Sequence, residues 1–289
     1  MKTGIIGLGN MGAGMALSAR RAGLETYGYD PDTRARAELE AAGVVLVDSI
    51  ATLMAQAEAI VLSLPNSDII EQVVWGPGGL LEHGRAGQIV LDTSTADPAS
   101  TQKIAQALEA SPLQLVDGPV SGGPKAAHAG SMTMLLGGDS DNIARLAPVL
   151  DALTAKRVHV GPVGAGHSAK LFNNLLCGIN LLAAGEAIRV ARAAGLNVEQ
   201  ILEGVNAGSG RSAVTEVNCP TWILNGAFNS GFTMKLMRKD LRLAAEMIEK
   251  SGASAPLSRE ALRLWADSVA TLADEEDFNR IVDFVEPNK

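Results

Sequence analysis

The first half of the chain alternates between short apolar runs and longer segments in which apolar residues recur with the helical period. Short apolar runs bounded by glycine, proline and small polar residues are typical of buried strands. Strands that alternate with helices predict an α/β domain with an open sheet. A helix is expected over Asn142–Leu153. The expected strands are Lys2–Ile6, Glu25–Tyr29, Ala59–Leu64, Gln88–Leu91, Leu113–Val116, Met132–Leu136 and Arg157–Val160.

The pattern changes between Gly161 and Gly195. A glycine-rich turn opens this stretch, and a long run of helix formers without proline follows until Gly195, a residue that commonly ends helices. The run predicts a helix of roughly 45 Å. Because it is apolar on more than one face, we expect it to be the buried spine of a second domain. The apolar residues concerned are Leu171, Leu175, Leu176, Ile179, Leu182 and Ala183.

Only helical patterns follow this spine. Asn197 and Gln200 form a capping box at the start of the next helix. The domain boundary is therefore expected as a change of architecture, with an α/β domain over residues 1–162 and an all-α domain over residues 163–289. The expected helical segments are Val198–Val205, Ser212–Asn225 with an interruption at Pro220, Met234–Ser251, Leu257–Leu272 and Phe278–Val285.

A GxGxxG motif, from Gly7 to Gly12, follows the first expected strand and precedes an alanine-rich helix. Gly7 permits the tight turn, Gly9 lets the backbone approach a pyrophosphate, and Gly12 lets the helix pack closely on the strand. The free N–H groups at the helix start, around Asn10 and Met11, suit phosphate groups. The motif in this context predicts a Rossmann dinucleotide-binding domain.

Asp30 ends the second expected strand, where an acidic residue binds the ribose hydroxyls of a dinucleotide. A carboxylate there repels a 2′-phosphate, so the sequence favours NAD. Arg34 and Arg36 follow closely and partly offset this effect, so NADP is not excluded. Asp30 is also a suitable N-cap for a helix after Pro31.

Small polar residues follow further expected strands, and in an open α/β sheet the ligand lies beyond the carboxyl ends of the strands. A turn or cap role is the commoner explanation for any one serine or threonine. Their coincidence after several strands favours one crevice. The candidates are Ser63, Leu64, Pro65, Asn66, Ser94, Thr95, Ser121, Gly122 and Gly123.

Composition narrows the class of protein. The 289 residues are 47% hydrophobic, with a formal net charge of -8 and no basic stripe, which disfavours a nucleic-acid partner. Cys177 and Cys219 are far apart, and four isolated histidines lack ligand spacing, so we expect no metal. No apolar run is judged long enough to span a membrane, and a strand begins at once, without room for a signal peptide. A cytoplasmic protein is expected.

Lys170 and Asn174 lie at i and i+4 near the start of the long helix, so they share a face. A lysine beside an amide on a rigid helix suits proton transfer, although a solvated lysine is the more common explanation. Lys239 and Asp240 would ordinarily belong to a solvated helix face. Arg211 follows Gly210 in a loop, where it either grips a carboxylate or caps the preceding helix.

These residues fall in motifs that resemble those of the β-hydroxyacid dehydrogenases, typified by 3-hydroxyisobutyrate dehydrogenase. The resemblance extends over nearly the whole chain. It implies a Rossmann domain, an all-α domain that helps to form homodimers or homotetramers, and reversible hydride transfer. The motifs are GLGNMG at Gly7–Gly12, DGPVSGG at Asp117–Gly123, GAGHSAKLFNN at Gly164–Asn174 and KDLRLA at Lys239–Ala244.

The resemblance also implies roles for individual residues. Lys170 would be the catalytic acid/base, and Asn174 would position the substrate. The segment Ser121–Gly123 would bind the acid group of the substrate. Lys239 would reach the cofactor or substrate, with Phe232 packed near the same crevice.

The identity of the substrate stays open. Pro124 and Lys125 follow the glycine pair at positions where other members of the family vary. Lys125 and His128 suit a larger or more polar substrate than hydroxyisobutyrate. The loop at Arg211 lacks the aromatic residue that follows it in 3-hydroxyisobutyrate enzymes. L-threonate, serine-type acids, tartronate semialdehyde/glycerate and short ω-hydroxy acids are alternatives. More remote alternatives are an imine reductase, which usually carries another proton donor in place of Lys170, and a non-catalytic dinucleotide sensor.

Overall fold

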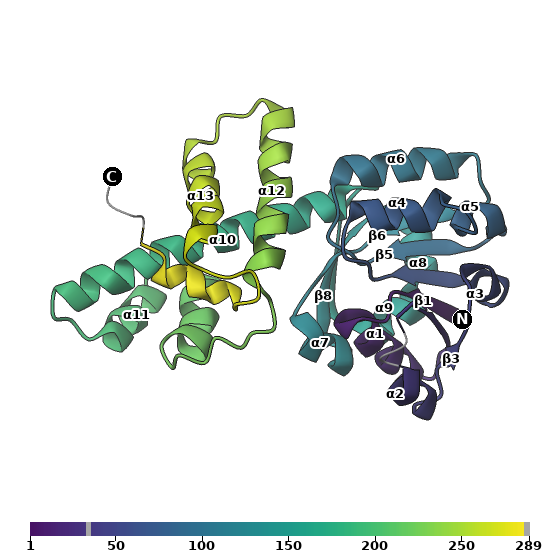
Figure 1. Cartoon of the computed structure of the whole chain (residues 1–289), viewed down its shortest axis with the longest axis horizontal. Coiled ribbons are helices and arrows are strands. Elements are labelled where there is room, and N and C mark those ends of the chain that lie inside the picture. The colour runs from purple at the N-terminus through teal and green to yellow at the C-terminus, as the bar shows by residue number, and fades with distance from the viewer. Residues whose placement is uncertain (33–35, 286–289) are drawn as a thin grey trace. The chain divides into compact units, whose positions relative to one another are not determined.

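The structure is a computed structural model that describes residues 1–32 and 36–285. The chain forms two compact units, Met1–Lys170 and Leu171–Lys289 (Figure 1). The first is an α/β unit and the second is helical. The predicted fold class, a Rossmann domain followed by an all-α domain with a long helix, is thereby confirmed.

The first unit is built on a sheet with the order β3-β2-β1-β4-β5-β6-β8-β7, and β9 pairs with β8. The first six strands are parallel, and their order reverses between β1 and β4, as in a dinucleotide-binding Rossmann sheet. β8 runs antiparallel to β6 and β7. The strands are β1 Lys2–Ile6, β2 Glu25–Tyr29, β3 Val45–Leu46, β4 Ala59–Leu62, β5 Ile89–Asp92, β6 Gln114–Asp117, β7 Val120–Ser121, β8 Met132–Gly137 and β9 Thr154–Gly161.

Helices cover both faces of this sheet, so alternate residues of one strand enter two different cores. Ile5 packs with residues of one group of helices, whereas Ile6 packs with residues of the other. The helices of both groups are labelled in Figure 1. The first group is α1 Asn10–Arg21, α2 Arg36–Ala41, α7 Gly123–Ala129, α8 Ser140–Arg145 and α9 Ala147–Leu153. The second group is α3 Ile50–Gln56, α4 Ser67–Trp75, α5 Leu80–His83 and α6 Pro98–Glu109.

Three details of this unit differ from the prediction. The segment after Asp117, for which the sequence predicted no strand before Met132, contains β7 and then α7, which begins at Gly123. The helix expected over Asn142–Leu153 is two helices that meet at Leu146, because Pro148 is tolerated only in the first turn of the second one. β3 was not expected, since two residues are too few for a periodic signal.

The long helix α10 spans Ala165–Ala193. It ends as predicted: Gly195 has φ +70°, and the N–H of Leu196 donates to the Ala191 carbonyl. Leu171 and Leu175 lie in the core as expected for a spine, but the expectation is wrong for Leu176, which is 59% exposed. The expectation that no apolar run reaches membrane length is also wrong, since α10 is long and apolar enough by composition. Its buried face packs in the core of a helical unit, which explains the same composition.

The second unit packs shorter helices on α10 (Figure 1). Its core contains the fully buried Trp265. The Trp265 indole N–H donates to the Gly178 carbonyl, so the ring is fixed on α10. The expected last helix, Phe278–Val285, is a 3-10 helix over Phe278–Asp283. The other elements are α11 Val198–Ala207, the π-helix η1 Val214–Ile223, α12 Met234–Ser251, α13 Pro256–Asp267 and the 3-10 helix η2 Ser268–Ala270.

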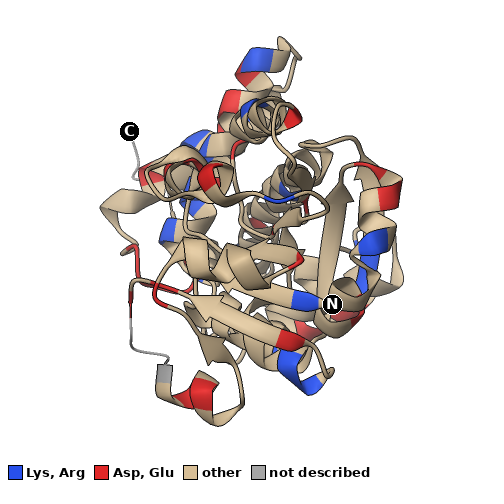
Figure 2. Ribbon diagram, turned by 90° about the vertical axis from the view of Figure 1, so that its right-hand side faces the viewer, with Lys and Arg blue, Asp and Glu red and all other residues tan. Residues whose placement is uncertain are grey.

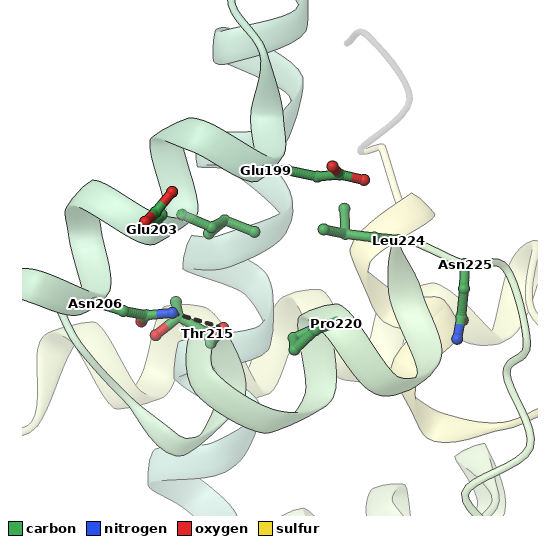
Figure 3. A pocket seen from close by; sticks show the side chains of 8 residues that line it. Glu199, Glu203, Asn206, Thr215, Pro220, Leu224 and Asn225 are labelled. Carbon is green, nitrogen blue, oxygen red and sulfur yellow. Dashed lines mark hydrogen bonds between the residues drawn. The ribbon is translucent and has the colours of Figure 1, made fainter.

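Pro220 does not interrupt the segment as expected but lies inside the π-helix η1. A π-helix joins each N–H to the carbonyl five residues earlier, and proline has no N–H to give. The carbonyl left without its partner is that of Thr215. It accepts a hydrogen bond from the Asn206 side chain at 3.1 Å (Figure 3). The side chain from α11 thus replaces the missing backbone donor, and the helix continues.

Candidate active site

The glycines of the GxGxxG loop have distinct steric roles. Gly7 has φ +92°, and a Cβ there would lie 2.3 Å from the Ser63 carbonyl oxygen at the end of β4. A Cβ on Gly12 would lie 1.8 Å from the Gly7 oxygen. A Cβ on Gly9 would meet nothing within 4 Å. The loop therefore presses against the sheet and α1 on one side and leaves open space above Gly9 on the other.

The space above Gly9 fits the phosphates of a dinucleotide. Gly9 is the N-cap of α1 and has no side chain to cover the first N–H groups of the helix. Exposed Asn10 and half-buried Met11 follow directly. Such a helix start, with positive partial charge, binds anions. NAD(P) would thus be held by the loop over Gly7–Gly12.

Asp30 lies beside this loop, because its Oδ2 accepts a hydrogen bond from the Leu8 N–H at 2.6 Å. Its Oδ1 accepts from the N–H of Asp32 at 2.8 Å. Within the described residues α2 spans Arg36–Ala41, so the cap role considered for Asp30 stays a prediction. Arg34 and the side chain of Arg36, considered above for NADP, lie outside the described residues. The carboxylate is consequently fixed at the end of β2, where the ribose of a dinucleotide binds.

Some strand-end candidates have structural partners. The Asn66 side chain caps α4 by accepting from the Ile69 N–H at 3.0 Å. Ser94 is 5% exposed, and its hydroxyl accepts from the Leu64 N–H at 3.0 Å. The exposed Pro65 lies between Leu64 and Asn66, and the half-buried Thr95 follows Ser94. The loops after β4 and β5 are thereby joined to each other.

Lys170 and Ser121 meet in the first unit. Lys170 is 7% exposed, and its Nζ donates a hydrogen bond to the Ser121 Oγ at 3.0 Å. Ser121 lies on β7 and pairs with Thr133 of β8. Gly122 and Gly123 follow with φ +121° and +67°, so the chain turns sharply without side chains. Lys170 and Ser121 belong to two separate sequence motifs, and the fold brings their side chains into contact.

In the second unit, Asn174 and Asp240 form a buried pair. Asn174 is 6% exposed, and its Nδ2 donates to the Asp240 Oδ2 at 2.7 Å. Its Oδ1 accepts from the Asn173 amide at 3.0 Å. The Lys239 ammonium lies 3.3 Å from the Asp240 Oδ1. Asp240 is 2% exposed, so the expectation of a solvated face does not hold for it.

The remaining candidates have other surroundings. The Arg211 side chain is 63% exposed and lies 3.7 Å from the Glu216 carboxylate. Phe232 packs edge to face on Phe278, with 5.3 Å between the ring centroids. Lys125 is exposed on α7. The backbone carbonyl of His128 accepts a hydrogen bond from the Ser18 hydroxyl, so it anchors α7 to α1.

The sequence analysis missed a buried polar network at the start of α10. His167, treated above as an isolated histidine, is 0% exposed and bonds to residues of three other segments. Its partners include Asp117, whose pKa is raised by burial against the opposing influence of His167 and of two backbone N–H groups. No spacing rule detects such partners, because they are 50 to 73 residues away.

Further features bear on ligands. In the view of Figure 2, Lys and Arg lie scattered among Asp and Glu. The structure shows no metal site among residues 1–32 and 36–285. No three His, Cys, Asp or Glu side chains of these residues lie together in a way that could hold a metal ion. A pocket of about 300 Å³ lies between α11 and η1, and none of the site residues expected from the sequence lines it (Figure 3). It is lined by Glu199, Leu202, Glu203, Asn206, Thr215, Pro220, Leu224 and Asn225.

Comparison with known proteins bears on the identity of this site. Residues 2–161 match the model of the NAD-binding domain of 6-phosphogluconate dehydrogenase. Residues 164–285 match that described as NAD-binding of NADP-dependent 3-hydroxyisobutyrate dehydrogenase. The 2-(hydroxymethyl)glutarate dehydrogenase of Eubacterium barkeri is 34% identical over 98% of this chain and 94% of its own. The chain belongs to the β-hydroxyacid dehydrogenase family. The family predicted from the sequence motifs is thereby confirmed.

Other β-hydroxyacid dehydrogenases agree with this assignment. The NAD-dependent L-serine dehydrogenase of Pseudomonas aeruginosa is 33% identical over 98% of this chain and 97% of its own. The structure of Mycobacterium tuberculosis 3-hydroxyisobutyrate dehydrogenase with L-serine is 30% identical and covers 98% of both chains, with a TM-score of 0.91. This β-hydroxyacid dehydrogenase is therefore an oxidoreductase that acts on CH–OH donors with an NAD(P) cofactor.

Proposed function

We propose that this dehydrogenase oxidises a short β-hydroxy acid to its aldehyde or keto acid with Lys170 as the general acid/base. The observation that carries the proposal is the hydrogen bond from the Nζ of the buried Lys170 to the Oγ of the half-buried Ser121. A nearly buried ammonium costs free energy unless a partner compensates for lost water. A lysine retained in such a place, within hydrogen-bonding range of a predicted substrate-binding residue, suits proton transfer.

Lys170 would exchange one proton with the substrate. In oxidation, its neutral amine accepts the proton of the substrate hydroxyl as the C–O bond becomes a carbonyl. In reduction, its ammonium returns that proton to the carbonyl oxygen. The bound nicotinamide supplies the complementary chemistry by accepting or returning the hydride.

The substrate carboxylate would bind at Ser121–Gly123. The Ser121 hydroxyl can donate a hydrogen bond to an anion. The backbone N–H groups of Gly122 and Gly123 can donate as well, because these residues have no side chain that would block the approach of the anion. Arg211 of the helical unit is a second candidate, since a guanidinium can bind a carboxylate through two hydrogen bonds. The substrate class is a hydroxy acid in which the carboxylate lies one carbon from the carbinol.

In the second unit, Asn174, Lys239 and Asp240 are proposed as substrate-binding residues. Asp240 and Asn173 bond to both ends of the Asn174 carboxamide, which fixes its orientation. A fixed amide suits the task of positioning a substrate. Lys239 would add positive charge for the cofactor or substrate, and Phe232 would supply an apolar wall.

NAD is proposed as the preferred cofactor because Asp30 is held beside the GxGxxG loop. The loop residues of the cofactor site would be Gly7, Gly9, Asn10, Met11 and Gly12. Ser63, Leu64, Pro65, Asn66 and Thr95 would line the neighbouring strand ends. We also propose a cytoplasmic location, because the sequence has only two cysteines, Cys177 and Cys219, which lie far apart and show no disulfide framework.

A homo-oligomer is proposed because α10 exposes apolar side chains. Phe172 is 51% exposed, Leu176 is 59% exposed and Val190 is 69% exposed. Phe172 and Leu176 are separated by one helical turn and lie on the same side of α10. A second copy of the chain would remove this apolar surface from water. A dimer or tetramer is expected.

The experiment is a panel of hydroxy acids with NAD and NADP. The panel contains 3-hydroxyisobutyrate, 2-(hydroxymethyl)glutarate, L-serine, L-threonate and D-glycerate, and the readout is the absorbance of the reduced nicotinamide. Turnover of at least one acid, with NAD favoured, is expected. Binding of NAD without turnover of any acid would contradict the proposal and favour a dinucleotide sensor.

A further inference from the structure

The imidazole of His167 connects α10 to the loop after β5 and to the helix α6. Its Nε2 lies 3.1 Å from the carbonyl oxygen of Ser94, in the loop after β5. Its Nδ1 lies 2.7 Å from the hydroxyl of Thr101 on α6. A carbonyl oxygen only accepts, so Nε2 carries a hydrogen, and in the neutral ring Nδ1 accepts from the Thr101 hydroxyl. Both nitrogen atoms are thus engaged in a side chain that is 0% exposed.

The backbone N–H of His167 donates a hydrogen bond to Asp117, the last residue of β6. The Asp117 carboxylate accepts from the N–H of Gly164 at Oδ1 and from the N–H of His167 at Oδ2, each at 2.7 Å. A carboxylate at a helix N-terminus satisfies N–H groups that have no partner within the helix and is favoured by the helix dipole. Asp117 thus anchors the first turn of α10 from outside the helix. The His167 ring adds a lateral restraint that Asp117 alone does not supply.

His167 precedes Lys170 by three residues on α10, so the two side chains lie on neighbouring positions of the helix surface. Along the axis they are separated by about 4.5 Å. Ser121, which accepts from Lys170, follows Asp117 by four residues. One helical turn is therefore fixed to the sheet at two points, and any rotation or shift at His167 changes the distance between Lys170 and Ser121.

We propose that His167 is a positioning residue that fixes the first turn of α10 so that the Lys170 ammonium stays on Ser121. The inference rests on the proposed function, because it assigns the effect of His167 on turnover to proton transfer at Lys170. His167 itself touches neither the reacting atoms nor the cofactor in this account. Its contribution comes from holding a general acid/base within the narrow geometry that proton transfer requires.

The test is a double-mutant cycle of His167→Leu and Lys170→Ala, followed by steady-state kinetics with NAD and the acid of the panel that is turned over fastest. His167→Leu introduces an apolar side chain of similar size and removes both hydrogen bonds of the imidazole. His167→Gln has an amide that can both donate to Ser94 and accept from Thr101, so it serves as the conservative variant. His83→Leu, in the same unit, is the control for a lost histidine.

His167→Leu is expected to lower kcat by roughly tenfold to a hundredfold, as a misplaced catalytic group does, and to leave KM for NAD within about twofold. His167→Gln should recover most of that loss. In the Lys170→Ala background, His167→Leu should change kcat by less than about twofold, because residues that act as one unit are not additive. Hydrogen–deuterium exchange should rise in a peptide over residues 165–171 and stay unchanged around β1.

An equal loss on His167→Leu with and without Lys170 would overturn the inference and leave the proposed function intact. Wild-type kcat in His167→Leu would overturn it as well. Wild-type turnover in Lys170→Ala alone would instead refute the proposed function, and the inference with it, as would a panel in which no acid reacts. If His167→Leu does not fold, Thr101→Val removes one of the two bonds at nearly constant volume. It must then show the same non-additivity with Lys170→Ala.

Discussion

The Lys170 ammonium donates a hydrogen bond to the Ser121 hydroxyl, with 3.0 Å between Nζ and Oγ. The two residues are 49 positions apart and come from an α-helix and a two-residue strand. Lys170 is 7% exposed, so the bond is sheltered from water on most sides. This pair links the proposed proton-transfer residue to the proposed carboxylate site.

Ser121→Ala should raise KM for the acid by about tenfold, since a hydrogen bond to a charged group is lost. KM for NAD should stay nearly unchanged. Ser131→Ala, at an exposed position of the same unit, is the control. The companion measurement compares an acid with its neutral amide. Equal kcat/KM for the two compounds would mean that no anion site exists here.

Asp30→Ala should narrow the preference for NAD over NADP. The carboxylate repels a 2′-phosphate and is expected to bond the ribose hydroxyls, so its removal weakens NAD binding and relieves the repulsion. The measurement is kcat/KM for each cofactor. Asp32→Ala is the matched control, because it removes a neighbouring carboxylate and keeps the backbone N–H that donates to Asp30. A wild-type enzyme that prefers NADP would contradict the prediction.

The stability contributed by Asp117 should fall as the pH rises. Burial raises the pKa of Asp117 in the folded state. Between the unfolded value of about 3.9 and the raised folded value, the folded state therefore binds more protons than the unfolded state, and the free energy of unfolding decreases with pH. Thermal unfolding of wild type and Asp117→Asn should show a wild-type advantage that shrinks across this range. An advantage that grows with pH would show that the native pKa is lowered instead.

Leu176→Glu should weaken self-association. A charge on the exposed apolar side of α10 would be buried without a partner if a second copy packs there. Light scattering coupled to gel filtration measures the mass directly. Glu199→Gln, on the exposed part of α11, is the control. A monomeric wild-type enzyme, or an oligomer that Leu176→Glu leaves unchanged, would contradict the proposed interface.

The periodic parts of the fold were predictable from the sequence. Lys2–Ile6 and Glu25–Tyr29 were predicted to the residue, because short apolar runs beside glycine have few alternatives. The start of α7 was not, since Gly123 and Pro124 look like a turn unless the first turn of a helix is considered. The two-residue strand that holds Ser121 is also too short for a periodic signal.

Tertiary partners set the limit of the sequence analysis at the site. His167 has no neighbour in sequence that indicates its role, because Thr101 is 66 positions away and Ser94 is 73. Leu176 is a second residue whose surroundings the sequence could not predict, because it is apolar but exposed. Its helix is apolar on several faces, but periodicity alone cannot distinguish a face that packs in its own unit from one left exposed.

The central claim is that Lys170 transfers the proton, and the most direct measurement is kcat of Lys170→Ala beside its affinity for NAD. Affinity should be nearly unchanged, because the proposed cofactor contacts lie at Gly7–Gly12 and Asp30. Lys156→Ala, an exposed lysine on β9, should behave as wild type. We predict that Lys170→Ala lowers kcat at least about a hundredfold, the usual contribution of a general acid/base. A kcat near that of the wild type would contradict the assignment.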